Sequence, residues 1–130
     1  MRLLSSDDLI NIHQVVIAET GGASGLRDPG MLQAIAAKPA TSFGGEELYP
    51  DTSSQAAALY EAVVNYHVFI DGNKRTSIAA LGLFLFQNGY ELTATGQALE
   101  DFTIKIANSH PDLADIASWI RQHTQERTTP

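Results

Sequence analysis

Residues 67–76 read HVFIDGNKRT, a short polar break between two apolar segments, and this break organises the predicted fold. Its central Asp-Gly-Asn sequence favours a turn and interrupts a helix. Apolar residues recur at helical spacing across 59–64 before the break and across 78–86 after it. The pattern predicts one helix that carries His67 on its apolar face, followed by a buried central helix that begins near Asn73.

Helix start and stop signals extend this pattern toward the N-terminus. The spacing of Ser5 and Asp8 predicts a capping box that opens a first helix, and the glycines at 21–22 end it. The Asp-Pro pair at 28–29 predicts the start of a second helix, which Pro39 ends.

The remaining segments predict short extended pieces and two more helices. Glycine, serine and proline across 40–50 indicate a loop or a short hairpin. An extended piece is predicted within 90–95, and helices around 99–106 and 113–120. The polar tail from about residue 123 is expected to fray.

Composition agrees with a single all-α domain, residues 1–130, folded as a compact bundle of about six helices with one small β-hairpin. The chain is 44% hydrophobic and has no cysteine, which excludes disulfide frameworks and thiol nucleophiles. No apolar run reaches the roughly 18 residues of a membrane span. The N-terminus turns acidic too soon for a signal peptide, so we expect a cytoplasmic protein with no membrane partner.

The charges are unevenly distributed along the chain. The net charge is −7, which argues against direct nucleic-acid binding because that binding needs lysine and arginine. Between residues 39 and 104 the only basic residues are Lys74 and Arg75, among eight acidic residues. This isolated pair is either solvated surface charge or part of a local anion site.

Several features of the break favour the anion site. A helix that begins near Asn73 offers unpaired N–H groups and the positive end of its dipole. Gly72 lets an anion approach the backbone closely, and Lys74 and Arg75 add fixed positive charge. The pattern predicts a phosphate site without a P-loop sequence.

Asp71 and His67 add chemistry to that predicted phosphate site. A carboxylate beside phosphates can hold Mg²⁺, and a histidine can accept a proton from a hydroxyl nucleophile. Phe69 has no polar role and is expected to anchor the loop. Taken singly, these residues read as a packed core histidine, an ordinary turn and surface charge. Taken together, they indicate phosphoryl or nucleotidyl transfer.

The same stretch resembles the signature loop of the Fic/Doc superfamily, which reads His-Pro-Phe-x-(Asp/Glu)-Gly-Asn followed by Gly-Arg or Lys-Arg. Lys74, where typical Fic proteins have glycine, resembles the Doc (death-on-curing) toxin branch. Residues 26–32, LRDPGML, look like a second stretch of Doc-like proteins. The matched loop positions are His67, Phe69, Asp71, Gly72, Asn73, Lys74 and Arg75.

The resemblance implies roles for these residues. His67 would be the general base and Asp71 the Mg²⁺ ligand, while Phe69 supports the loop. The catalytic set would be His67, Asp71, Asn73, Lys74 and Arg75, and the phosphates of ATP would be held by Gly72, Asn73, Lys74 and Arg75. A hairpin called the flap would align an extended target segment by strand addition, through Ser42, Phe43, Gly44, Gly45 and Glu46.

The chain departs from the family pattern at two positions, the first with little expected effect and the second with a bearing on the expected reaction. Val68 replaces the usual proline, and Ile78 stands where AMP-transferring members carry a second arginine. With Lys74, Ile78 makes the chain resemble Doc-type enzymes more than the AMP-transferring members. This resemblance implies transfer of the γ-phosphate of ATP to a hydroxyl of elongation factor Tu. The alternatives are a Fic-type adenylyltransferase, which moves AMP to a protein hydroxyl, and a catalytically silent partner-binding module.

The resemblance also implies a partner chain. Self-inhibited Fic proteins carry a Ser/Thr-x-x-x-Glu helix, and the only such spacing here, from Ser42 to Glu46, falls in the flap region. An inhibitor is therefore expected from another chain, a Phd-like antitoxin. Any contact with operator DNA would then come from that antitoxin.

Overall fold

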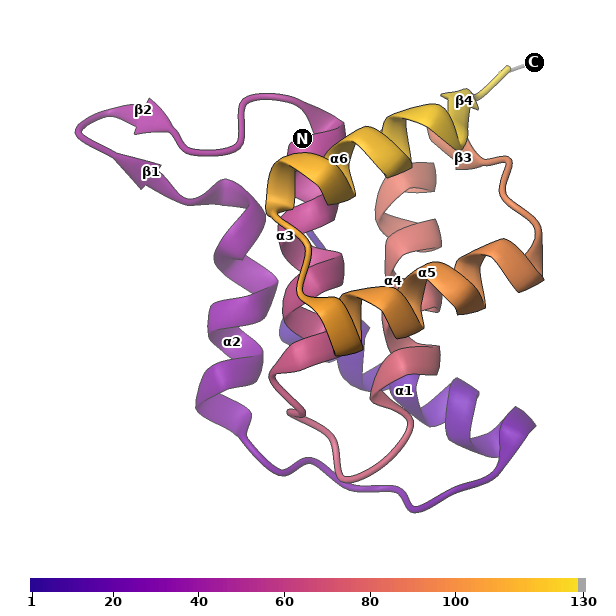
Figure 1. The fold of residues 1–130 in the computed structure, drawn as a ribbon. Coiled ribbons are helices and arrows are strands. Elements are labelled where there is room, and N and C mark those ends of the chain that lie inside the picture. The colour runs from indigo at the N-terminus through magenta and orange to yellow at the C-terminus, as the bar shows by residue number, and fades with distance from the viewer. Residues whose placement is uncertain (129–130) are drawn as a thin grey trace.

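Six α-helices and two pairs of short strands make up residues 1–128, the part of the chain that this computed structural model describes (Figure 1). In chain order the elements are α1 (Ser6–Thr20), α2 (Pro29–Ala37), the 3₁₀ turn η1 (Lys38–Ala40), β1 (Ser42–Phe43), β2 (Glu46–Glu47), α3 (Thr52–Asn65), α4 (Asn73–Gln87), β3 (Tyr90–Leu92), α5 (Gly96–Ser109), α6 (Leu113–Gln122) and β4 (Thr124–Glu126). The predicted all-α bundle of about six helices is confirmed.

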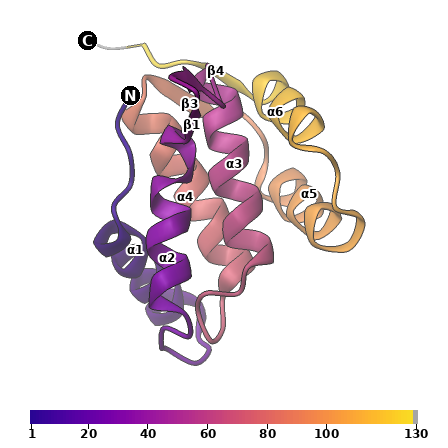
Figure 2. The same ribbon diagram turned by 90° about the vertical axis from the view of Figure 1, so that its left-hand side faces the viewer.

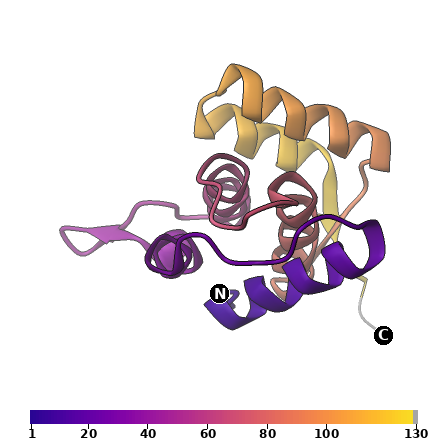
Figure 3. The ribbon, with the colours of Figure 1, turned by 90° about the horizontal axis from the view of Figure 1, so that it is seen from below.

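The helices form three layers, with α3 and α4 in the middle (Figure 3). Helices α1 and α2 cover one side of this central pair, and α5 and α6 cover the other. The two central helices run in opposite directions, joined by the loop at one end of the bundle (Figures 1 and 2). The polar break in the sequence is therefore the turn between the two innermost helices.

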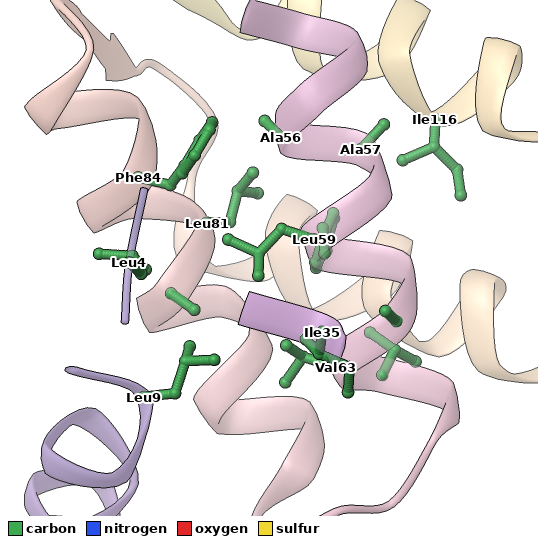
Figure 4. Close-up of a cluster of buried hydrophobic side chains, with 14 of the residues drawn as sticks. Leu4, Leu9, Ile35, Ala56, Ala57, Leu59, Val63, Leu81, Phe84 and Ile116 are labelled. Carbon is green, nitrogen blue, oxygen red and sulfur yellow. The ribbon is translucent and has the colours of Figure 1, made fainter. Parts of the chain in front are cut away.

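Small side chains on α3 let the layers approach closely. Ala56 and Ala57 are fully buried, and their Cβ atoms leave room for large residues of the neighbouring helices (Figure 4). On α4 the side chains of Leu81 and Phe84 have no exposed surface. Ile116 of α6 is also fully buried, so one apolar cluster extends through the three layers.

The predicted caps begin the first two helices. Ser5 and Asp8 form a capping box, in which the side chain of each accepts a hydrogen bond from the backbone N–H of the other. The Asp28 carboxylate accepts the Met31 N–H at 3.0 Å, and proline occupies the first turn of α2. Pro39 lies inside η1, so the chain keeps turning after α2 ends.

The predicted hairpin is present, and its turn depends on glycine. Ser42 pairs with Glu47 and Phe43 with Glu46 in antiparallel register. Gly44 and Gly45 have φ angles of +60° and +84°, which L side chains rarely adopt. The Phe43 side chain is 84% exposed at this hairpin.

The expectation that the tail frays from about residue 123 is wrong for its first part. Strand β4 pairs antiparallel with β3, and His123 and Arg127 extend the contact through bonds of their backbone to Thr93 and Gly89. The Arg127 guanidinium also lies 4.1 Å above the Phe86 ring. The Thr-Gln-Glu strand has no apolar pattern, so its hydropathy could not predict the pairing. Residues 129 and 130 lie outside the described part.

No helix within residues 1–128 has the combination of length and apolar character that crossing a bilayer requires.

A matched pair of phenylalanines on α4 tests this packing. We expect Phe84→Ala to lower the free energy of unfolding by about 3–5 kcal/mol, because it leaves a cavity in the core. Phe86→Ala should cost roughly 1 kcal/mol, since Phe86 is 51% exposed and its ring carries the Arg127 guanidinium on one face. Urea denaturation of the two variants measures the difference, and equal losses would contradict the buried position of Phe84.

Candidate active site

The N-terminus of α4 opens into a pocket. Gly72 is the N-cap residue, with a φ angle of +76°, and has no side chain to bond the first N–H groups of the helix. These N–H groups therefore have the orientation and charge of an anion site. The pocket has a volume of about 310 Å³ and is lined by His67, Ile70, Asp71, Gly72, Asn73, Lys74 and Arg75.

His67 lies in this pocket and not on α3. The helix ends at Asn65, Tyr66 is its C-cap residue, and His67 follows in the left-handed region with a φ angle of +48°. Its side chain is exposed. The prediction that His67 continues the apolar face of α3 is wrong, and so is its interpretation as a packed core histidine. Apolar spacing could not show that the helix stops two residues earlier.

The Asn73 side chain closes the loop. It is buried; its Oδ1 accepts the Phe69 N–H at 3.1 Å and its Nδ2 donates to the Phe69 carbonyl at 2.9 Å. The Phe69 ring is 2% exposed, as expected for a loop anchor. Because both polar ends of the Asn73 amide are used inside the protein, the group that Asn73 has left for a ligand is its backbone N–H at the start of α4.

A second segment, the connector between α1 and α2, holds the loop from the other side. Gly25 accepts the Ile70 N–H at 3.0 Å, and the Val68 carbonyl accepts the Arg27 N–H at 2.7 Å. A β-bridge joins Leu26 to Phe69 between these bonds. Sequence reasoning missed this pairing, although the connector includes part of the LRDPGML stretch that resembles Doc-like proteins.

Asp71 is fixed by this connector and by its own loop. Its Oδ2 accepts the Ala23 N–H at 3.1 Å and its Oδ1 accepts the Gly72 N–H at 2.8 Å. These hydrogen bonds lower the pKa of Asp71 below the ordinary value of 3.8, and the bond from Ala23 has the largest effect. The positive charge of Arg75 lowers this pKa further. The carboxylate is thus ionised at neutral pH. Its contribution to stability is present above pH 3.8 and is lost as the pH falls through the lowered pKa.

The donor set at Asp71 fits Mg²⁺ bound together with phosphate. Each carboxylate oxygen accepts one N–H, which leaves lone pairs for a cation, and the side chain is 47% exposed. Residues 1–128 contain no group of three or more His, Asp or Glu side chains that could hold a metal. One carboxylate suffices where phosphates supply further oxygen ligands, as is usual for Mg²⁺.

The two cations of the site differ in their surroundings. The Arg75 guanidinium donates to Thr20 Oγ1 and to the Gly21 carbonyl, and it lies 3.6 Å from the Asp71 carboxylate. Lys74 is exposed and forms no ion pair within residues 1–128. Lys74 is therefore the more available partner for an added anion, while Arg75 also ties α4 to the end of α1.

A second cavity, of about 470 Å³, adjoins the first between α4 and α5. Its lining is mostly apolar, and it shares Lys74 and Arg75 with the first pocket. The other lining residues are Ile78, Gly96, Glu100, Thr103 and Ile104.

The hairpin predicted to dock a target is not brought to the loop. Strands β1 and β2 lie near the start of α3, whereas His67 follows its other end (Figures 1 and 2). A helix of 14 residues is about 20 Å long. The docking role of Ser42, Phe43, Gly44, Gly45 and Glu46 stays a prediction.

Fold and site together define an all-α protein in which a histidine and a carboxylate lie beside an uncapped helix N-terminus. A family model described as the Fic/DOC family matches residues 3–85. The chain is 38% identical over 100 residues to the Toxin Doc of Mycolicibacterium smegmatis, covering 75% of this chain and 77% of the relative. It is 31% identical over 122 residues to the Protein kinase doc of Escherichia phage P1, covering 94% and 95%. The chain belongs to the Fic/DOC family.

The connector glycines provide a test of the Asp71 geometry. A Cβ atom added at Gly22 would lie 2.5 Å from Asp71 Oδ2. We therefore expect Gly22→Ala to displace the carboxylate from the Ala23 N–H and to raise the pKa of Asp71 toward 3.8. An NMR titration of the Asp71 carboxyl carbon measures this pKa.

Gly21→Ala is the matched control. Gly21 also has a positive φ angle, +82° against +114° for Gly22, but an added Cβ would meet nothing within 4 Å. The Asp71 pKa should stay lowered in this variant. An equal rise in both variants would assign the effect to backbone strain instead of contact with Asp71.

The left-handed conformation of His67 has a cost that can be measured. Glycine adopts a positive φ angle at less cost than alanine does. We therefore expect the His67→Gly variant to be more stable than the His67→Ala variant by about 0.5–1 kcal/mol. His110 ends α5 with the same φ angle of +48° and should show the same preference. Thermal and urea unfolding measure both pairs; an alanine variant as stable as its glycine counterpart would contradict the assigned conformation.

Proposed function

We propose that this protein is a Doc-type toxin that transfers the γ-phosphate of ATP to a hydroxyl of elongation factor Tu. One observation carries the proposal: an exposed histidine lines the same pocket as the free N–H groups of a helix N-terminus and Lys74. The names of the relatives, Toxin Doc and Protein kinase doc, support this reaction and this biological role.

The start of α4 would bind the phosphate that is transferred. Backbone N–H groups at a helix N-terminus and the positive end of the dipole favour an anion there. Lys74 adds an exposed positive charge, and Asn73 contributes its backbone N–H because its side chain holds the loop. These groups would stabilise the charge on the phosphoryl oxygens during transfer.

Asp71 would hold the Mg²⁺ that accompanies ATP. Bound there with the phosphates, the metal would neutralise negative charge on their oxygens. The low pKa of Asp71 keeps its carboxylate available for this role at neutral pH. The N–H groups of Ala23 and Gly72 orient both of its oxygens before any ligand arrives.

His67 would act as the general base. Its imidazole accepts the proton of the target hydroxyl, and the hydroxyl oxygen forms a bond to the γ-phosphorus. The bond from that phosphorus to the oxygen bridging to the β-phosphate breaks, and ADP leaves with the electron pair. The exposure of His67 lets a protein substrate reach it.

The cavity between α4 and α5 favours phosphate transfer over AMP transfer. It adjoins the phosphate pocket, and its apolar residues Ile78 and Ile104 suit the nucleoside of ATP. Ile78 stands where AMP-transferring members of the family carry an arginine, which would favour phosphates at that position. The γ-phosphate would then lie at α4, close to the target hydroxyl.

The hairpin would extend the contact with the target, provided the bound segment is long enough. About 20 Å separates the two ends of α3. An extended segment that pairs with the hairpin and presents its hydroxyl to His67 therefore needs roughly six residues between these points. The free edges of β1 and β2 and the exposed Phe43 are suited to such pairing.

Control of the toxin would come from a separate antitoxin, a Phd-like chain. The relative named Toxin Doc supports such a partner. With its net charge of −7, this chain is unsuited to binding DNA directly, so the antitoxin would supply any such contact.

Incubation with ATP, Mg²⁺ and elongation factor Tu, followed by mass spectrometry of the factor, tests the proposal. We expect a gain of one phosphoryl group, abolished in His67→Ala and retained in His110→Ala. A gain of AMP would establish the adenylyltransferase alternative. An unmodified target, together with no binding of ATP and Mg²⁺ by calorimetry, would favour the silent binding module.

A further inference from the structure

His13 is a buried histidine beneath the active-site loop, and no role in the proposed reaction uses it. It lies on α1 with 2% of its surface exposed. Its ring stacks on the Phe69 ring, with centroids 4.0 Å apart and planes within 4° of parallel. Its Nε2 lies 2.7 Å from the Asp71 carbonyl oxygen. Because a carbonyl only accepts, Nε2 carries the hydrogen of this bond.

The hydrogen bond from His13 restrains a peptide group that could otherwise flip. The Asp71–Gly72 peptide precedes a glycine with a φ angle of +76°, and glycine tolerates alternative backbone conformations. His13 holds the carbonyl end of this peptide, and Asp71 Oδ1 holds its N–H end. The two bonds point in opposite directions, so together they define the orientation of the peptide plane.

The other contacts of the loop do not hold this peptide. The Asn73 side chain bonds to Phe69, and the connector pairs with Val68 and Ile70. Within residues 1–128, His13 is thus the group that secures the Asp71 carbonyl to the bundle. A reversed peptide would take the Gly72 N–H away from the Asp71 carboxylate.

We propose that His13 is a positioning residue, whose Nε2–H locks the Asp71–Gly72 peptide and so orients the Asp71 carboxylate toward the phosphate pocket. Its stacking on Phe69 places the ring, and the hydrogen bond transmits this placement to the loop. The inference rests on the proposed function in that it assigns the locked carboxylate to Mg²⁺ and nucleotide binding. Removing a group that orients a metal ligand through a hydrogen bond typically lowers metal affinity by 10–100-fold.

Two substitutions separate the ring from the N–H donor. His13→Phe keeps an aromatic ring for Phe69 but has no donor, whereas His13→Gln has an N–H donor and no ring. Calorimetry with Mg²⁺ and β,γ-imido-ATP should show roughly tenfold weaker binding for His13→Phe and nearly normal binding for His13→Gln. The NMR resonance of the Gly72 amide should move in His13→Phe and stay near its normal position in His13→Gln.

Trp119→Leu is the structural control. Trp119 also stacks on a phenylalanine, with ring centroids 4.2 Å apart, but it lies on α6 away from the loop. Its loss should lower stability without weakening nucleotide binding. Comparable weakening in Trp119→Leu and His13→Phe would assign the effect to general destabilisation and overturn the positioning role.

Other outcomes are equally decisive. Unchanged affinity or an unmoved Gly72 amide in folded His13→Phe would overturn the proposal. Should that variant not fold, a tenfold loss of affinity in His13→Gln would overturn it and normal affinity would support it. If the unsubstituted protein binds no nucleotide, the proposed function fails; the Gly72 amide in the two variants still decides whether His13 locks the peptide.

Discussion

The two hydrogen bonds between the Asn73 side chain and the Phe69 backbone are the constraint on which the site depends. They close the loop between the innermost helices, so that α4 begins directly after Gly72, with no side-chain cap on its first N–H groups. The connector from α1 to α2 then pairs with the closed loop and brings Ala23 to the Asp71 carboxylate. A single amide in the core thereby helps to set the positions of His67, the Asp71 carboxylate and the start of α4.

This arrangement gives an acidic protein a pocket with the features of an anion site. The chain carries a net charge of −7, yet the positive end of α4 and the side chain of Lys74 meet in one pocket. Backbone N–H groups bond to the Asp71 carboxylate and lower its pKa, and Arg75 is shared among Asp71, Thr20 and the Gly21 carbonyl. Local backbone geometry therefore outweighs the overall charge at this point.

Features with local causes were predicted correctly from the sequence. The capping box of Ser5 and Asp8, the Asp-Pro start of α2 and the glycine turn of the hairpin each depend on residues close together in the chain. Strand β4 and the bridge between Leu26 and Phe69 join residues far apart through backbone bonds. Such bonds leave no periodic pattern in side chains, so the pairing partners could not be predicted.

The sequence by itself determined the helix count, the polar break and the residue types of the site, because turns, caps and apolar spacing act over a few residues. Tertiary structure decided where His67 and the hairpin lie. His67 leaves α3 and faces solvent because the loop pairs with the connector, which apolar spacing does not encode. The hairpin stands near the opposite end of α3, because a straight 14-residue helix separates the two. His13 became part of the site only when packing placed its ring against Phe69.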